Sequence, residues 1–135
     1  MKYIIYSDGG ARGNPGPAGC GFVIQNEHGE ILYEGSEYIG YTTNNQAEYQ
    51  ALYMGLEKIR ALGEIENIHC YLDSELVVKQ LNKEYKMKNP DLRVYFDKIN
   101  MLNFEFGNCI TFHHVRREQN SHADRLANEA MDRGK

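Results

Sequence analysis

The sequence predicts a mixed α/β domain in which helices cover one sheet. Two kinds of segment alternate along the 135 residues. Some are short runs rich in β-branched and aromatic residues, and others have apolar residues at helical spacing. Their order is three strands, a helix, a strand, two helices, a strand and a final helix, which is typical of helices layered on a sheet. The length favours a single domain over residues 1–135.

The first three predicted strands cover residues 2–8, 19–26 and 30–40. Residues 2–8 (KYIIYSD) are apolar, β-branched or aromatic at most positions, as in a buried strand. The second and third strands flank His28-Gly29, a plausible tight turn, so we expect them to form a hairpin.

The remaining elements alternate between helix and strand. We predict helices over residues 44–63, 74–85, 91–102 and 121–133, and strands over residues 68–73 and 109–115. In the first helix, Leu52, Leu56 and Ile59 share one stripe, and Gly63 is a typical C-terminal stop. Pro90 separates the second helix from the third.

The composition argues against a membrane protein and a secreted protein. No stretch approaches the ~20 apolar residues of a membrane span, and the N-terminus lacks a signal-peptide pattern. Cys20, Cys70 and Cys109 lack CxxC spacing and suit buried free thiols. We therefore expect a cytoplasmic protein with no membrane partner.

The charge pattern gives a divided signal for nucleic-acid binding. The formal net charge of −4 argues against it, because Lys and Arg make phosphate contacts. Residues 79–98, however, carry six basic side chains against three acidic ones. A solvated helix face explains this segment unless a phosphate-handling site lies nearby.

Residues 9–21 hold six glycines and two prolines directly after Asp8. They contain neither G-x-G-x-x-G nor G-K-[ST], and they lead into a strand, which excludes dinucleotide-binding and P-loop cradles. A rigid connection between antiparallel strands is one explanation. The other is a loop bare of side chains, which a ligand's backbone could approach closely.

Four acids have local explanations when taken singly. Asp8 could form an Asx-turn, and Asp73 could cap the following helix. Glu48 could complete a capping box begun by Asn45, and Asp124 could complete another. Local structure alone would then account for all four side chains.

Taken together, the same acids point to one site. Asp8 and Asp73 each end a predicted strand and would stand side by side if those strands are parallel neighbours. Glu48 shares the apolar stripe of its helix, and Asp124 lies on the packed side of the last one. Converging carboxylates repel unless a cation binds them, and oxygen ligands select Mg²⁺ or Mn²⁺. Two such ions form a clamp that supports phosphodiester hydrolysis.

The histidines do not predict a zinc site. His113 and His114 are adjacent on a strand and point to opposite faces. His28, His69 and His122 show no ligand spacing, so we expect surface or partly packed side chains.

Four motifs in order resemble ribonuclease H of type 1 along essentially the whole chain. They are Asp8-Gly9-Gly10 with GNPGPAGCG, TTNNQAE (42–48), LDSELVV (72–78) and HADRLANEA (122–130). The resemblance implies a ribonuclease H-like α/β fold: a five-stranded mixed sheet, three strands antiparallel and the last two parallel, with helices on both faces. It implies Mg²⁺-dependent endonucleolytic cleavage of the RNA strand of RNA–DNA hybrids, leaving 3′-hydroxyl and 5′-phosphate ends.

The resemblance also implies roles for particular residues. Two Mg²⁺ ions, with Mn²⁺ as a substitute, would be held by the catalytic acids Asp8, Glu48, Asp73 and Asp124. Substrate contacts would come from Gly9, Gly10, Asn14, Thr43, Asn44 and Asn45. The glycine backbone would sense the 2′-hydroxyls that distinguish RNA from DNA. We expect a monomer with little base specificity.

The chain departs from the better-known bacterial pattern in two places. Only eight residues separate Val115 from Asp124, so the loop with a catalytic histidine is missing. Its replacement would be Arg116, Arg117, Glu118 or His122, and we favour an arginine or Glu118. The Trp-containing basic protrusion is also absent, which predicts weaker binding with a shallow salt dependence. This short-loop pattern resembles the archaeal-like and retroviral-like members of the family. Some of these also cut double-stranded RNA, and the sequence leaves that substrate open.

Two other functions remain open from the sequence. A catalytically idle hybrid-binding module would have no use for inward-facing carboxylates that need charge compensation. A 3′–5′ exonuclease or DNA resolvase would keep the fold and change the chemistry. Proofreading exonucleases carry Asp-x-Glu in the first strand, and Asp8-Gly9-Gly10 lacks the second acid.

Overall fold

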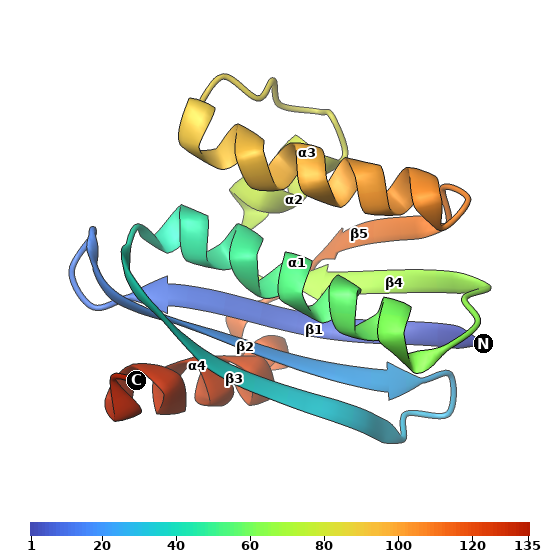
Figure 1. The fold of residues 1–135 in the computed structure, drawn as a ribbon, viewed down its shortest axis with the longest axis horizontal. Coiled ribbons are helices and arrows are strands. Elements are labelled where there is room, and N and C mark those ends of the chain that lie inside the picture. Colours follow the sequence, from blue (N-terminus) through green and yellow to red (C-terminus); the bar gives the residue numbers. More distant parts are fainter.

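The computed structural model describes all residues, 1–135, and forms one five-stranded sheet of order β3-β2-β1-β4-β5 (Figure 1). The strands are β1 (Lys2–Ala11), β2 (Gly16–Asn26), β3 (Ile31–Thr42), β4 (Asn67–Leu72) and β5 (Ile110–His114). The helices are α1 (Asn44–Leu62), α2 (Glu75–Leu81), α3 (Pro90–Glu105), α4 (Ser121–Arg133) and a 3₁₀ turn, η1 (Arg117–Asn120). β1 to β3 are antiparallel, and β4 and β5 run parallel to β1, so the predicted mixed sheet is confirmed.

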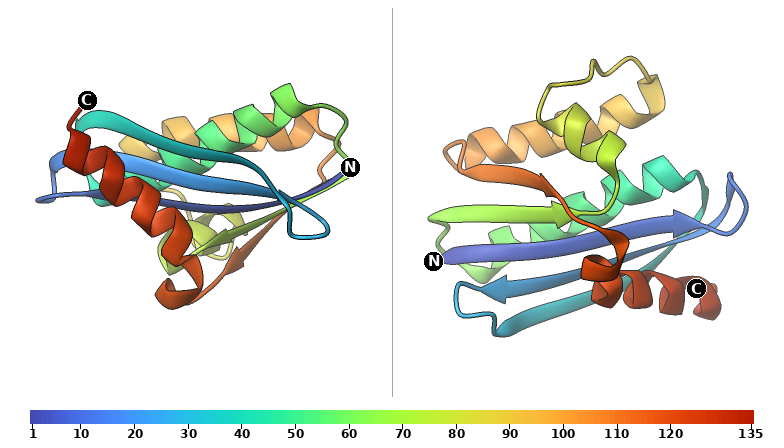
Figure 2. Two further views of the ribbon diagram at one scale, coloured as in Figure 1. Left: turned by 90° about the horizontal axis from the view of Figure 1, so that it is seen from below. Right: turned by 180° about the vertical axis from the view of Figure 1, so that it is seen from behind.

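Helices cover both faces of the sheet, as expected. α1 and α3 lie on one side and α4 lies on the other (Figure 2). The main apolar core fills the space between α1 and the sheet, where Ile5 and Ile68 pack with Leu52 and Leu56. Ala123 and Ala127 of α4 are also buried, and α4 covers β2 and β3 but leaves β4 and β5 bare. None of the helices is long and apolar enough to cross a membrane.

β1 is the central strand and extends beyond the end of its parallel neighbour, β4. β4 ends at Leu72, which pairs with Ser7, whereas β1 continues to Ala11 alongside β2. From Asp8 onward, the side of β1 toward β4 therefore has no strand partner. This opening in the sheet lets side chains from both helical layers reach one point.

The glycine-rich segment is mostly strand, so the prediction of a long loop after Asp8 is wrong. β1 and β2 continue as a hairpin, and only residues 12–15 form the turn. A Cβ on Gly9 would lie 2.2 Å from the carbonyl carbon of Ala47, and one on Gly21 would lie 2.2 Å from the carbonyl oxygen of Ala123. These glycines therefore let α1 and α4 approach the sheet more closely than any side chain allows.

Helix caps and ends differ from the predictions in informative ways. Thr43 and Gln46 form the capping box of α1, so Asn45 and Glu48 do not. The Ser74 side chain caps α2, which leaves Asp73 without that role, and α4 begins without a side-chain cap. α2 is shorter than predicted, because Lys83 just beyond it adopts a left-handed conformation with φ of 64°.

Candidate metal centre

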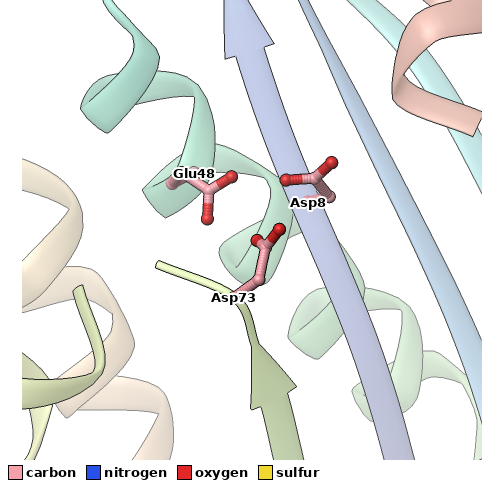
Figure 3. A group of neighbouring side chains, drawn as sticks. All are labelled: Asp8, Glu48 and Asp73. Atoms are coloured by element: carbon pink, nitrogen blue, oxygen red, sulfur yellow. The ribbon is translucent and has the colours of Figure 1, made fainter. Parts of the chain in front are cut away.

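Three carboxylates meet in the opening beside β1 (Figure 3). Asp8 lies on β1, Glu48 on the first turns of α1, and Asp73 directly after β4. One oxygen from each side chain lies within 4.8 Å of the other two. Asp8 is only 8% exposed and Glu48 only 6%. The prediction that Asp8 and Asp73 stand side by side and that Glu48 faces inward is therefore confirmed.

Glu48 is held in place by the backbone of β1. The Gly9 N–H donates to Glu48 Oε1 at 2.8 Å, a contact that the missing side chain of Gly9 makes possible. The second oxygen, Oε2, is buried and has no hydrogen-bond partner. Because a buried charged oxygen without a partner is costly, this atom calls for a ligand.

The crowding of carboxylates changes their acid–base behaviour. Burial, followed by the hydrogen bond and charge of Glu48, raises the pKa of Asp8 from 3.8 to about 11. Burial raises the pKa of Glu48 from 4.5 to about 7, although hydrogen bonds from Asp8 and Gly9 oppose the shift. The site therefore retains protons at neutral pH unless a cation supplies positive charge.

The carboxylates line an open cavity of about 400 Å³. Asp124 reaches the same cavity from α4, on the opposite face of the sheet, and adds to the rise in the pKa of Asp8. Asp124 lies outside the compact trio, so the structure brings four acids to one cavity and three to one point. All ligand atoms are oxygens, and this donor set together with the unpartnered Glu48 Oε2 fits a hard divalent cation.

Arg117 is the one candidate for the missing histidine that lines the cavity. It lies in η1, and its Nε is 3.9 Å from Asp73 Oδ2. Its side chain is 86% exposed and therefore free to approach a bound anion. Arg116 and Glu118 are exposed outside the cavity, and His122 lies against Glu34 on β3.

Asn120 is a residue of the site that sequence reasoning missed. It is buried, and its Nδ2 donates to the Ser7 carbonyl at 2.9 Å and toward Asp73 Oδ1 at 3.5 Å. It thereby joins η1 to β1 and to the site. Its position before Ser121 signals only an ordinary helix start.

The predicted substrate residues lie together around the N-terminus of α1. Gly9, Gly10, Asn44 and Asn45 line the carboxylate cavity. Asn14 and Thr43 line a neighbouring cavity of about 230 Å³, which Asn45 also lines.

Hydrogen bonds join these residues to one another. Asn14 Oδ1 accepts from the Asn44 N–H at 3.0 Å, and Asn44 Oδ1 accepts from the Ala11 N–H at 2.7 Å. Thr43 is engaged in the cap of α1, whereas the Asn45 side chain has no hydrogen bond within the chain. Asn45 is therefore the amide that is free to bind a ligand.

The sheet order, the helices on both faces and the acids beside the central strand define a ribonuclease H-like fold. Residues 6–130 match a family model described as reverse transcriptase-like. A crystal structure of LC11-RNase H1 in complex with an RNA/DNA hybrid superimposes with a TM-score of 0.93 and 48% identity, covering 97% of both chains. The chain belongs to the type 1 ribonuclease H family.

Relatives of known sequence agree with this assignment. The chain is 44% identical over 127 residues to ribonuclease HI of Halobacterium salinarum, covering 94% of this chain and 63% of that protein. It is 44% identical over 133 residues to a bifunctional protein of Mycobacterium tuberculosis, covering 98% of this chain and 36% of that protein. The chain thus spans between about a third and two thirds of the length of these relatives.

Proposed function

We propose that the chain is a metal-dependent endoribonuclease that hydrolyses the RNA strand of RNA–DNA hybrids, leaving 3′-hydroxyl and 5′-phosphate ends. The observation that carries this proposal is the group of three carboxylates, two of them buried, with one oxygen from each within 4.8 Å of the other two, in a cavity open to solvent. The crystal structure of the 48% identical LC11 enzyme with a hybrid supports the choice of substrate.

Asp8, Glu48, Asp73 and Asp124 would hold two Mg²⁺ ions, with Mn²⁺ as a substitute. When bound, such ions supply an activated water and stabilise the leaving oxygen. The protein orients the acids: the Gly9 N–H fixes Glu48, and Asn120 donates toward Asp73. Burial of Asp8 and Glu48 keeps their repulsion strong, so the site favours cations over water.

Arg117 takes the place of the missing loop histidine in this proposal. It extends from η1 with a mostly exposed side chain and already lies near Asp73. A guanidinium there would attract the scissile phosphate and stabilise charge that develops on its oxygens. A guanidinium donates hydrogen bonds and accepts none, so the role of Arg117 would be electrostatic.

Substrate choice would rest on the cavity wall formed by β1 and α1. The Gly9 and Gly10 backbone presents no side chain, and Asn45 offers a free amide beside it. Amide groups and bare backbone suit contacts to 2′-hydroxyls and base edges across a minor groove. Asn14, Thr43 and Asn44 would shape the adjoining cavity for the backbone of the hybrid.

The remaining expectations are part of the same proposal. We expect residues 1–135 to fold as a single catalytic domain, to act as a monomer and to work in the cytoplasm. Cys20, Cys70 and Cys109 are free thiols, two of them buried, which suits a reducing compartment.

A cleavage assay with a blunt RNA–DNA hybrid tests the proposal. The RNA strand is labelled, and parallel lanes contain Mg²⁺, Mn²⁺, EDTA, a DNA duplex, an RNA duplex and the Asp73→Asn variant. We expect internal cuts in the RNA of the hybrid, lost in EDTA and in the variant. Cuts in the RNA duplex lane would show that the chain also cleaves double-stranded RNA. If that duplex stays intact, the substrate range is restricted to hybrids.

Two outcomes would favour the alternatives. A hybrid that is bound but uncut in both metals would indicate an idle binding module. Products that shorten only from the RNA 3′ end, and that disappear when that end is blocked, would indicate an exonuclease. Near-normal cleavage by Asp73→Asn would contradict the assignment of the metal ligands.

A further inference from the structure

The face of the sheet opposite α1 is bare over β4 and β5. α4 packs over β2 and β3, and Figure 2 (right) shows β4 and β5 with no helix in front of them. Alternate residues of these strands point to this face. His69 and Tyr71 of β4 therefore lie beside Thr111 and His113 of β5, in the register His69 to Thr111 and Tyr71 to His113.

Two imidazoles converge on one point of this face. His69 Nδ1 lies 2.7 Å from Thr111 Oγ1, and His113 Nε2 lies 2.8 Å from the same oxygen. The ring centroids of His69 and His113 are 5.7 Å apart. Both histidines are only half-buried, and Thr111 is exposed, so an ion has access from solvent.

Neighbouring aromatic rings hold one of these imidazoles in place. Tyr71 stacks on His113 with ring centroids 5.1 Å apart. Tyr6 stacks in turn on Tyr71, with the same distance between centroids. A ring packed in this way loses little further freedom when it binds a ligand. Burial and the charge of His69 lower the pKa of His113, which favours its neutral, metal-binding form.

We propose that His69 Nδ1 and His113 Nε2 form a second metal site, which binds a divalent transition ion on the bare face of β4 and β5. Imidazole ligands suit Cu²⁺, Ni²⁺ and Zn²⁺, and Cu²⁺ binds most tightly to such donors. Thr111 Oγ1 fills the point that the two rings now share, so metal–nitrogen bonds of about 2.0–2.1 Å require both rings to turn from that hydroxyl toward an ion on its solvent side. Water completes the coordination.

This site differs from the carboxylate centre in donors, location and metal class. Mg²⁺ prefers oxygen ligands and does not compete for two imidazoles. An ion held here would link β4 to β5, because His69 and His113 are diagonal neighbours on the two strands. It would stabilise the pairing of the strands that lead to Asp73 and to Arg117.

Copper titration of the intact chain tests the site. The chain has ten tyrosines and no tryptophan, so tyrosine fluorescence can report on Cu²⁺ held beside the Tyr71–His113 stack. With excess Mg²⁺ present, we expect saturable quenching and nitrogen couplings from two imidazoles in the electron paramagnetic resonance spectrum. His69→Ala and His113→Ala should each weaken Cu²⁺ binding at least about tenfold.

Two matched controls separate this site from other copper ligands. His28→Ala removes an exposed histidine from the turn between β2 and β3, and Asp73→Asn disables the carboxylate centre. Both variants should bind Cu²⁺ as the wild type does. Equal affinity in all four variants, or a loss confined to Asp73→Asn, would overturn the proposal. Without copper, the thermal midpoints of both histidine variants should equal that of the wild type. A loss of Cu²⁺ binding then reflects the missing imidazole and not a failure to fold.

Discussion

Asp8 and Glu48 hold protons that the unfolded chain would release. Burial raises both pKa values, and the hydrogen bond and charge of Glu48 raise that of Asp8 further, so the folded protein binds more protons than the unfolded chain above about pH 4.5. A raised pKa of an acid stabilises the fold at low pH, and the advantage is lost as pH rises toward the folded value. Without metal, the fold should therefore weaken as pH rises.

This pH dependence is measurable in EDTA. Between pH 4.5 and 7, where Glu48 has lost its proton in the unfolded chain but keeps it in the folded protein, we expect the thermal midpoint to fall by about 4 °C or more. Asp8→Asn should flatten the slope, because it removes an acid that holds its proton in the folded protein and releases it in the unfolded chain. Glu27→Gln, in an exposed turn, should leave the slope unchanged. An equal slope in all three proteins would mean that Asp8 does not hold a proton in the folded protein.

Arg117 gives a second prediction at this scale. Arg117→Ala should lower kcat for hybrid cleavage by about 10²–10³, the usual cost of losing a group that stabilises developing charge. KM should change much less, since the side chain is largely exposed before catalysis. Arg116→Ala is the matched control, because Arg116 lies outside the cavity, and it should retain wild-type kcat. Equal losses in the two variants would remove Arg117 from the proposed mechanism.

The sequence revealed the acids because their positions follow strand ends and helical stripes. It did not reveal Asn120, whose bond to the Ser7 carbonyl joins residues 113 positions apart. It also did not predict that His69 lies close to His113, because only the register of two parallel strands brings these residues together. Contacts made by tertiary packing leave no periodic pattern in the chain.

At the scale of elements, the glycines of β1 set the distance between strand and helix. Gly9→Ala would put a Cβ within 2.2 Å of the Ala47 backbone, so α1 would have to move and carry Glu48 with it. Backbone cannot yield as a side chain can, and we expect a loss of about 1–3 kcal/mol in the free energy of unfolding. Cleavage should fall as well, because the Gly9–Glu48 bond would break.

Gly10→Ala is the matched control for this prediction. Its Cβ would meet atoms no closer than 3.7 Å, an ordinary contact. Chemical denaturation of both variants and the wild type measures the difference. Equal stability of Gly9→Ala and Gly10→Ala would show that α1 is not held by this close approach.

Most elements were predictable, and the failures share one cause. Periodicity identified α1, α4 and every strand, because burial against the sheet imposes an apolar pattern. Gly9, Gly10 and Gly16 predict a loop where the structure has strand, because glycine favours turns when only local preference is considered. In the fold, Gly9, Gly19 and Gly21 are required by neighbours that lie far away in the sequence.

At the scale of the whole molecule, charge is distributed unevenly around a net negative chain. The segment between α2 and α3 carries Lys83, Lys86 and Lys88, which line a surface hollow with Arg93. This segment would contact phosphates of the hybrid beyond the cavity.

Binding at different salt concentrations tests that contact. In the inactive Asp73→Asn background, changing both Lys86 and Lys88 to Gln should reduce the slope of log K against log salt by about 2. Lys2→Gln, at the far end of β1, should leave the slope unchanged. An unchanged slope in the double variant would place the phosphates elsewhere on the molecule.

The opening beside β1 also bears on how long each molecule survives. Its acids come from four segments far apart in the chain, so the opening exists only after β4 has paired with β1 and both helical layers have docked. Contacts of such long range form late in folding. An ion bound there therefore slows the unfolding rate and leaves the folding rate nearly unchanged. Metal supply would then govern the lifetime of the native state, and with it the resistance of the chain to proteolysis.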